Sequence, residues 1–192
     1  MPLFDHFDLL APLYDKVIGY KDPVKIVELG RLPVSGIVLD AGGGTGRISH
    51  ALLGQASQFV VLDLSFGMLQ KAAKKGGIET VNSHTEALPF PNDTFDAVIM
   101  VDALHHVCDQ SDTALELLRV VKPGGRIVIE EPDIGTLIVK IVALLEKLAL
   151  MRSRFLAPVQ IEALFPREET STKIERDSFN AWVMIEKVDA AE

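Results

Sequence analysis

The chain has 192 residues and a mass of 21.0 kDa, and 48% of its residues are hydrophobic, which suffices for one well-buried core and is short for two. Its formal net charge is -8 and its pI is near 5.1. No segment gathers more than two adjacent Lys or Arg residues, so nothing in the sequence offers an electrostatic footprint to nucleic acid. We expect one domain and no nucleic-acid partner.

Cysteine content and hydropathy indicate in which cellular compartment the protein is expected. Cys108 is the single cysteine, which excludes a disulfide framework within the chain and fits a reducing compartment, so a cytoplasmic protein is expected. Residues 1–10 carry acids where a secretory signal would carry positive charge. Three charged residues interrupt the longest apolar stretch, 134–150, which therefore predicts an amphipathic helix and no transmembrane segment.

Strand and helix signals alternate along the chain. The first thirty or so residues are typical of one or two helices. Short apolar runs rich in β-branched residues follow, and their near-continuous hydrophobicity predicts strands buried on both faces of a parallel sheet. These runs cover 36–41, 59–64, 95–101 and 125–131, with a weaker candidate at 78–83. The helices expected between them cover 46–54, 65–76 and 111–121, and a Lys-Pro-Gly-Gly stop follows the last.

Two strand-like segments lie near the end of the chain, at 170–176 and 180–188. Only three residues separate them, which is too short for a helical crossover, so they predict an antiparallel pair at the sheet edge. The whole pattern predicts an α/β fold. We expect a doubly wound, Rossmann-like, mostly parallel seven-stranded sheet with a C-terminal antiparallel hairpin and helices on both faces.

A glycine-rich turn follows the first predicted strand, in "DAGGGTG" (40–46). It opens a helix whose first N–H groups are free to bind a ligand. A side chain at Gly42 or Gly44 would keep the ligand off the backbone or forbid the turn. The spacing G-x-G-x-G, with Gly46 as its last member, differs from the G-x-G-x-x-G of dinucleotide dehydrogenases and from a Walker loop.

An acid ends the next predicted strand. Asp63 lies 17 positions after Gly46, where a carboxylate can accept hydrogen bonds from the two hydroxyls of a ribose. The alternative is that Asp63 only begins the following helix, but Ser65 is the better cap. The sequence therefore predicts a nucleoside site at the carboxyl ends of the first two strands.

With "SHTEALPFPNDTFDAVIMVDALHHV" (83–107), the chain resembles the class I S-adenosylmethionine-dependent methyltransferases, and within them the branch of the ubiquinone and menaquinone biosynthesis methyltransferases. The resemblance covers most of the chain and rests on five ordered motifs. They are "HFDLLAPLYD" (6–15), "LDAGGGTGR" (39–47), "VVLDLSFGML" (60–69), "TEALPFPNDTFDAVIMVDALHHV" (85–107) and "LRVVKPGGRIVI" (118–129).

The resemblance implies S-adenosyl-L-methionine as cofactor and S-adenosyl-L-homocysteine as product. The glycine loop would hold the methionine part of the cofactor, and Asp63 would bind the ribose. Leu64 and Met68 look like the apolar residues on either side of the adenine. The acid that orients the loop and receives the amino group is matched by Asp40, and the loop glycines are Gly42, Gly43, Gly44 and Gly46.

One position departs from the family pattern. Members of this branch often carry an aspartate, which accepts from the adenine amino group, where this chain has His84. A neutral imidazole nitrogen can also accept that bond, and the backbone at Thr85 and Glu86 can contact the adenine edge without a side chain. An exposed histidine without a role is the alternative.

Further contacts are implied at the end of the fourth strand and near the N-terminus. Val101 and Asp102 match family positions that contact the methionyl group, at a sheet edge where α/β proteins bind ligands. His105 and His106 follow, and because adjacent helical residues point in different directions, one would face the cofactor and the other the acceptor. Tyr14 resembles a lid residue over the cofactor, or else it anchors an N-terminal helix.

Methyl transfer from a sulfonium needs collinear reactants in a dry pocket and little acid–base machinery. If the acceptor must lose a proton, His105 is the candidate base. The acids Glu130, Glu131 and Asp133 lie past the fifth strand and are expected to form a solvated turn, with a site for a cation or a metal as the alternative. The cysteine and histidine spacing predicts no zinc site.

The resemblance divides the single domain, 1–192, into four parts. They are an N-terminal helical lid (1–34), a cofactor-binding core (35–131), a substrate-covering helical segment (132–168) and a closing β-hairpin (169–188). The apolar stripe at Leu137, Ile141, Leu144, Leu145 and Leu148 packs on the sheet, or covers an apolar acceptor, or forms a homodimer contact.

Two other functions remain open beside methyl transfer to an O-, C- or N-nucleophile of a small molecule. One is a regulatory module that binds S-adenosylmethionine without catalysis. The other is an NAD(P)-dependent oxidoreductase, favoured only by the glycine loop and Asp63.

Overall fold

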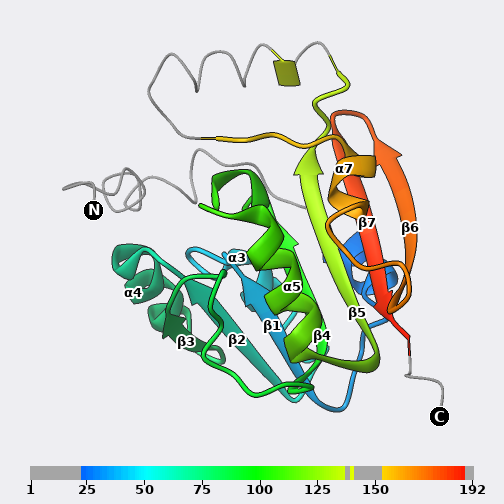
Figure 1. Ribbon diagram of the computed structural model, residues 1–192. Coiled ribbons are helices and arrows are strands. Elements are labelled where there is room, and N and C mark those ends of the chain that lie inside the picture. Colours follow the sequence, from blue (N-terminus) through cyan, green and yellow to red (C-terminus); the bar gives the residue numbers. More distant parts are fainter. Residues whose placement is uncertain (1–22, 137–138, 141–152, 189–192) are drawn as a thin grey trace.

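The computed structural model describes residues 23–136, 139–140 and 153–188, and its strands form one twisted sheet (Figure 1). In chain order the strands are β1 (Ile37–Ala41), β2 (Gln58–Asp63), β3 (Glu79–Asn82), β4 (Phe95–Val101), β5 (Val121–Pro132), β6 (Thr170–Asp177) and β7 (Asn180–Lys187). The helices are α2 (Pro23–Leu29), α3 (Arg47–Ala51), α4 (Phe66–Lys75), the 3-10 turn η1 (Leu104–His106), α5 (Gln110–Val120) and α7 (Pro158–Glu162).

The sheet has the order β3-β2-β1-β4-β5-β7-β6. Strands β3, β2, β1, β4 and β5 pair in parallel, and β7 pairs antiparallel with both β5 and β6. This confirms the predicted fold class, including the C-terminal hairpin. The chain runs outward from β1 to β3 and then returns to β4 on the other side of β1, so the carboxyl ends of β1 and β4 flank a topological switch point.

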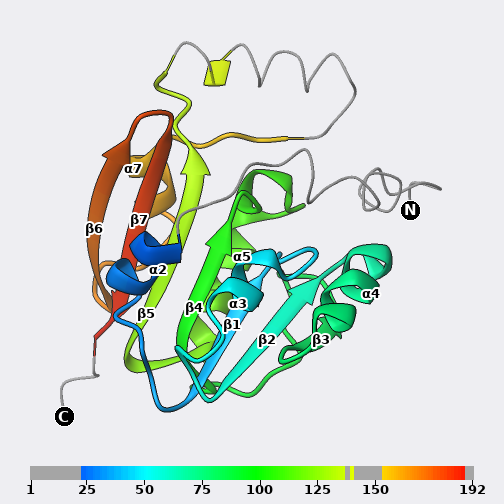
Figure 2. The same ribbon diagram turned by 180° about the vertical axis from the view of Figure 1, so that it is seen from behind.

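Helices cover both faces of the sheet, as the apolar strand runs predict. On one face α5 and α7 pack against side chains such as Leu39, Val98 and Ile129. On the other face α2 and α3 pack against Val38, Ile99 and their neighbours (Figure 2), and α4 packs on β2. Because neither face of the central strands is left to solvent, these strands are mainly apolar on both faces.

The largest differences between the observed and the predicted element boundaries are at α3 and β5. Helix α3 ends at Ala51, three residues before the predicted end. Strand β5 begins at Val121, the last residue of the predicted helix, and includes the Lys-Pro-Gly-Gly segment, because Val121 already pairs with Phe95 before an irregularity in the register. Neither shift moves a predicted site residue off its place at the sheet edge.

Some predicted features lie outside the described residues. Tyr14 and the five residues of the apolar stripe are among them. Within the described ranges, no helix is long and apolar enough to cross a membrane.

Candidate functional site

The glycine loop connects β1 to α3 at the switch point. Gly42, Gly44 and Gly46 have φ angles of 69°, 55° and 66°, a backbone region that L side chains rarely adopt. The loop is closed by a hydrogen bond of 2.8 Å from Gly46 N to the carbonyl of Gly43. The bare backbone that the sequence predicts is therefore present, and its curvature requires glycine.

The glycines differ in what a side chain would meet. A Cβ at Gly42 would lie 2.6 Å from the Cβ of Ala103, and a Cβ at Gly46 would lie 2.6 Å from Cδ1 of Ile78. Packing thus explains Gly42, for which we predicted a ligand-contact role. At Gly44 the nearest atom of the described residues is Oδ2 of Asp63, at 3.9 Å, so among these residues Gly44, unlike Gly42 and Gly46, has space beside it.

Asp63 ends β2 directly across from Gly44. Its Oδ2 accepts a hydrogen bond of 2.9 Å from Gly44 N, and its Oδ1 accepts one of 2.8 Å from Ser65 N. Ser65, and not Asp63, caps α4, by accepting from Met68 N, as the sequence predicts.

Apolar side chains follow Asp63 at the same edge. Leu64 is 53% exposed and Phe66 is 61% exposed, whereas Met68 is 2% exposed and already covered by protein. Exposed apolar side chains beside a predicted ribose-binding acid can contact a flat aromatic ligand. The resemblance to the family predicts a role for Leu64 and none for Phe66, which is exposed at the same edge.

Asp40 lies beneath the loop and is buried. Its Oδ2 accepts a hydrogen bond of 2.6 Å from Oγ of Ser49 on α3. Burial raises the pKa of Asp40 to about 6, although the Ser49 hydrogen bonds and the charge of Arg47 lower it. A Cβ at Gly43 would meet this carboxyl group at 2.5 Å, so Asp40 also supports the loop from below.

Thr85 and Glu86 lie in the loop between β3 and β4. The Glu86 carboxylate accepts from the backbone N–H groups of Cys108 and Asp109, at 2.7 and 3.1 Å, and so joins this loop to the start of α5. The Thr85 hydroxyl is 3.1 Å from that of Thr113 on α5. These side chains brace the loop, a role that the sequence did not predict.

Val101 and Asp102 end β4 at the switch point. Val101 is 8% exposed, and Asp102 has a φ of 52°, a strained value for a residue with a side chain. The backbone N–H of Asp102 donates to the carbonyl of Glu130, at 3.0 Å. Its carboxylate is 3.8 Å from the guanidinium of Arg47, which therefore also faces this edge.

His105 is buried, and its Nδ1 is 2.5 Å from Oε2 of Glu131 at the end of β5. The other oxygen of Glu131 accepts from the backbone N–H groups of Ala103 and Leu104, at 3.0 and 2.7 Å. The structure thus joins a predicted site residue to an acid that the sequence placed in a solvated turn.

The rings of the two histidines lie against each other. Their centroids are 3.9 Å apart and their planes are tilted by 46°, and both residues belong to the 3-10 turn η1. The ring of Phe155 stacks on His105 at 4.4 Å, and Nδ1 of His106 is 3.3 Å from the Ser153 hydroxyl. The pKa of His106 is lowered to about 3, mainly by burial and to a smaller extent by the charge of the nearby His105.

The acidic cluster at the end of β5 is buried, which corrects the expectation of a solvated turn. Glu130, Glu131 and Asp133 are 0%, 3% and 7% exposed. Asp133 accepts from Gly135 N at 2.8 Å and from Nε of Arg176 at 3.1 Å. The pairing of β5 with β7 and the contacts with the η1 turn cover these acids. The hydrophilicity of the local sequence does not indicate that burial. Among the described residues, no group of three or more His, Cys, Asp or Glu side chains could hold a metal ion.

The chain is similar to known proteins in sequence and in fold. Residues 39–129 match the methyltransferase domain family. The ubiquinone/menaquinone biosynthesis C-methyltransferase UbiE of Marinomonas sp. is 36% identical over 104 residues, which are 49% of this chain and 41% of that protein. The UbiE of Escherichia coli K12 matches to the same extent. The chain thus spans less than half the length of these curated relatives.

Solved structures share the fold. A putative methyltransferase of Haloferax volcanii, solved in complex with the Trm112 methyltransferase activator, superposes with a TM-score of 0.79 and 18% identity, over 97% of this chain and all of that one. The YcgJ protein of Bacillus subtilis gives 0.72 and 21%, over 80% and 70%. The [4+2]-cyclase SpnF gives 0.77 and 17%, over 96% and 95%.

Proposed function

We propose that this chain, which carries a class I S-adenosylmethionine-dependent methyltransferase domain, transfers a methyl group from that cofactor to a small-molecule acceptor. The domain match confirms the predicted family and cofactor. The observation that carries the proposal is the space beside Gly44, bounded by Asp63, at the switch point inside the matched segment.

The residues present fit the cofactor. The sulfonium of S-adenosylmethionine supplies an activated methyl group. Asp63 would accept from the ribose hydroxyls, and Leu64 with Phe66 would cover the adenine. Asp40 and the glycine loop would hold the methionyl end, with Val101 and Asp102 beside it. We propose Met68, Thr85, Glu86, His106 and Tyr14 as further cofactor contacts, in accordance with the family pattern.

We propose the class of methyl acceptor from the net charge of the chain and from the names of its relatives. An acidic chain of net charge -8 does not favour a polyanionic substrate. The UbiE relatives are named for C-methylation in ubiquinone and menaquinone biosynthesis, so a reduced quinone is the first acceptor that we propose. The segment 132–168 would cover an apolar acceptor, and residues 1–34 would close over the cofactor. We also propose that the protein forms a homodimer and is located in the cytoplasm.

The first test is binding of S-adenosylmethionine and S-adenosylhomocysteine by calorimetry. We expect micromolar binding that is lost in Asp63→Ala. Because Asp63 also holds Gly44 N, the variant Asp63→Asn serves as a control that keeps one acceptor oxygen for the loop. Absence of binding to both compounds in the wild-type protein would overturn the cofactor assignment.

The second test is transfer of a radiolabelled methyl group to hydroquinones, catechols, phenols and amines. Transfer to one class identifies the acceptor. Intact cofactor binding without transfer to any class would favour the regulatory module instead, and preferential binding of a nicotinamide cofactor would favour an oxidoreductase. The assay must follow the methyl group itself, because the fold is shared with a protein described as a cyclase.

A further inference from the structure

We infer that Glu131 is a positioning residue that holds His105 as the proton acceptor of the reaction, and that the methyl acceptor is therefore a molecule that loses a proton as it is methylated. This rests on the proposed methyl transfer. It assigns a role to an acid that no motif of the chain identifies, and it narrows the acceptor to phenols, enols, protic amines and activated aromatic carbons.

Glu131 is held by three donors. Its Oε1 accepts from the N–H groups of Ala103 and Leu104, and its Oε2 faces Nδ1 of His105 at 2.5 Å. A buried carboxylate needs such donors to offset the loss of hydration. Because two of them are backbone groups in a tight turn, the carboxylate cannot rotate away without leaving N–H groups unsatisfied. The orientation of His105 is therefore fixed from β5.

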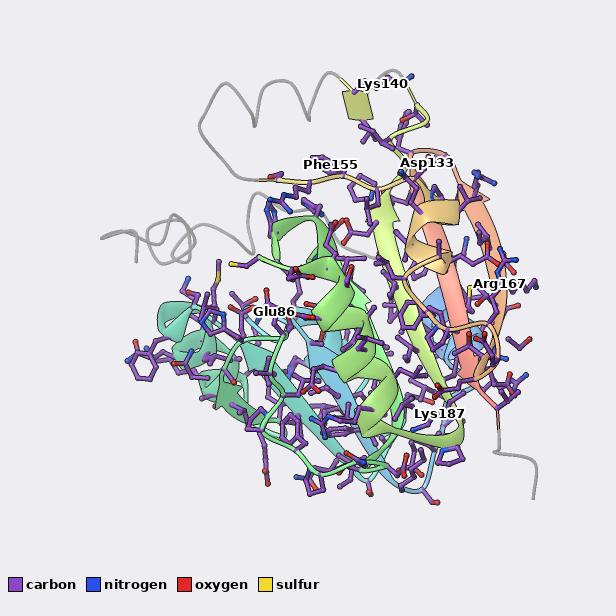
Figure 3. All side chains as sticks on the ribbon, in the orientation of Figure 1. Glu86, Asp133, Lys140, Phe155, Arg167 and Lys187 are labelled. Carbon is purple, nitrogen blue, oxygen red and sulfur yellow. The ribbon has the colours of Figure 1, made fainter. Side chains whose placement is uncertain are left out.

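The pair lies against the cofactor loop. The backbone N–H of Ala103 donates to Glu131, and the Cβ of Ala103 would lie 2.6 Å from a Cβ placed on Gly42. One residue thus contacts both the glycine loop and the carboxylate that holds His105. The labelled Phe155, whose ring stacks on His105, lies at the end of the sheet where β5 finishes (Figure 3). The pair therefore occupies the edge at which α/β proteins bind ligands.

The carboxylate selects one tautomer of His105. As Glu131 is an acceptor, Nδ1 must carry the proton, which places the imidazole lone pair on Nε2. In the reaction the acceptor atom bonds to the methyl carbon as the bond from that carbon to sulfur breaks, and the broken bond's electron pair stays on sulfur. The acceptor's proton moves to Nε2, and Glu131 offsets the positive charge of the resulting imidazolium.

The surroundings favour this proton transfer over a solvent-mediated one. Among the described residues, Glu131 from β5 and His106 from the same turn bring titratable side chains into contact with His105. Residues 153–155 contribute the ring of Phe155 and a hydrogen bond of 2.8 Å from Arg154 N to the carbonyl of His105. Water is thereby kept from the imidazole, which is 5% exposed as a residue.

Nitrogen NMR of histidine-labelled protein tests the tautomer without any acceptor. We expect the Nδ1–H form of His105 in the wild-type protein. In Glu131→Gln the amide oxygen is needed by Ala103 N and Leu104 N, so the amide NH₂ faces Nδ1 and His105 converts to the Nε2–H form. The matched control Glu130→Gln removes the adjacent buried acid of β5 and should leave the tautomer unchanged. An Nε2–H form in the wild-type protein would overturn the inference.

Kinetics with the acceptor found by methyl transfer tests the function of the pair. We expect Glu131→Gln to lower kcat by about 10²-fold or more, with KM and S-adenosylhomocysteine affinity changed only a few-fold, and to remove the acidic limb of the pH profile. In a His105→Ala background the same change should have almost no further effect on kcat. Unchanged kcat, or an equal loss in both backgrounds, would refute the pairing.

The two hypotheses fail in different ways. If no compound accepts a methyl group, methyl transfer as the function fails while the tautomer measurement still decides whether Glu131 positions His105. If transfer occurs to an acceptor that has no proton to lose, the proposed function stands and the inference about Glu131 is wrong.

Discussion

Asp40 and Ser49 form a buried hydrogen bond of 2.6 Å that joins the end of β1 to α3 beneath the glycine loop. Burial raises the pKa of Asp40 from 3.8 to about 6, so this carboxyl group changes its protonation state in a pH range where the protein can be studied. The loop that is proposed to hold the cofactor therefore rests on a group whose charge depends on pH.

The contribution of Asp40 to the stability of the protein should fall as the pH rises from 4 to 6. In that window the folded chain keeps a proton on Asp40 that the unfolded chain has released, so this group's contribution to the free energy of unfolding decreases with pH, by roughly 3 kcal/mol in total. Asp40→Asn cannot ionise and should escape this loss. Urea unfolding at pH 4 and pH 7 should show the variant gaining stability relative to wild type at the higher pH, and a constant difference would contradict the prediction.

Cofactor binding should release a proton near pH 6. If Asp40 receives the amino group of S-adenosylmethionine as proposed, the ligand's positive charge favours the ionised carboxyl group. Up to about half a proton should then leave at pH 6 and almost none at pH 8. Calorimetry in two buffers of different ionisation enthalpy measures this number. Asp40→Asn should release none at either pH, and an equal release from that variant would assign the proton to another group.

Two glycine variants should separate packing from ligand contact. Gly44→Ala and Gly46→Ala both introduce a side chain at positive φ, at a cost of about 1–2 kcal/mol. Gly46→Ala also meets Ile78 at 2.6 Å and Ala72 at 3.1 Å, so it should be the less stable in thermal unfolding. Gly44→Ala meets no atom of the described residues closer than 3.9 Å and should instead weaken S-adenosylmethionine binding by about tenfold or more. Unchanged affinity in Gly44→Ala would place the cofactor elsewhere.

His106 should remain neutral from pH 8 down to pH 5. Burial is the main reason that its pKa lies near 3, and His105 adds to the effect. The unfolded chain binds a proton there below about pH 6.5 and the folded chain does not, so stability is lost as the pH falls below that value. Nitrogen NMR should show no titration of His106 in this range, and His106→Gln should reduce the acid sensitivity. A midpoint near 6.5 would show that the ring is solvated.

Local pattern predicted much of this molecule. The apolar runs located β1, β2 and β4 because strands buried on both faces cannot alternate in polarity. The three residues between the last two strands required a hairpin, which the structure contains between β6 and β7. The glycines of the loop and the position of Asp63 after β2 were also apparent, because backbone approach to a ligand and the end of a parallel strand each leave a local signature.

The acids at the end of β5 show where such reasoning fails. Glu130, Glu131 and Asp133 have the local signature of a solvated turn, yet all three are buried. Their burial depends on the pairing of β5 with β4 and β7, in which Glu130 is opposite Val101 and Trp182. No periodicity within a strand encodes the identity of its neighbours.

The sequence by itself determined the alternation of strands and helices, the glycine loop and the acid that faces it, because each depends on residues close together in the chain. Only the tertiary structure decided that Glu131 holds His105, that Ser49 holds Asp40, and that Gly42 is required for packing while Gly44 leaves space. Those relationships depend on strand order and register, which bring residues 26 positions apart to within 2.5 Å. Cooperative packing of the whole sheet sets that distance, and no local segment specifies it.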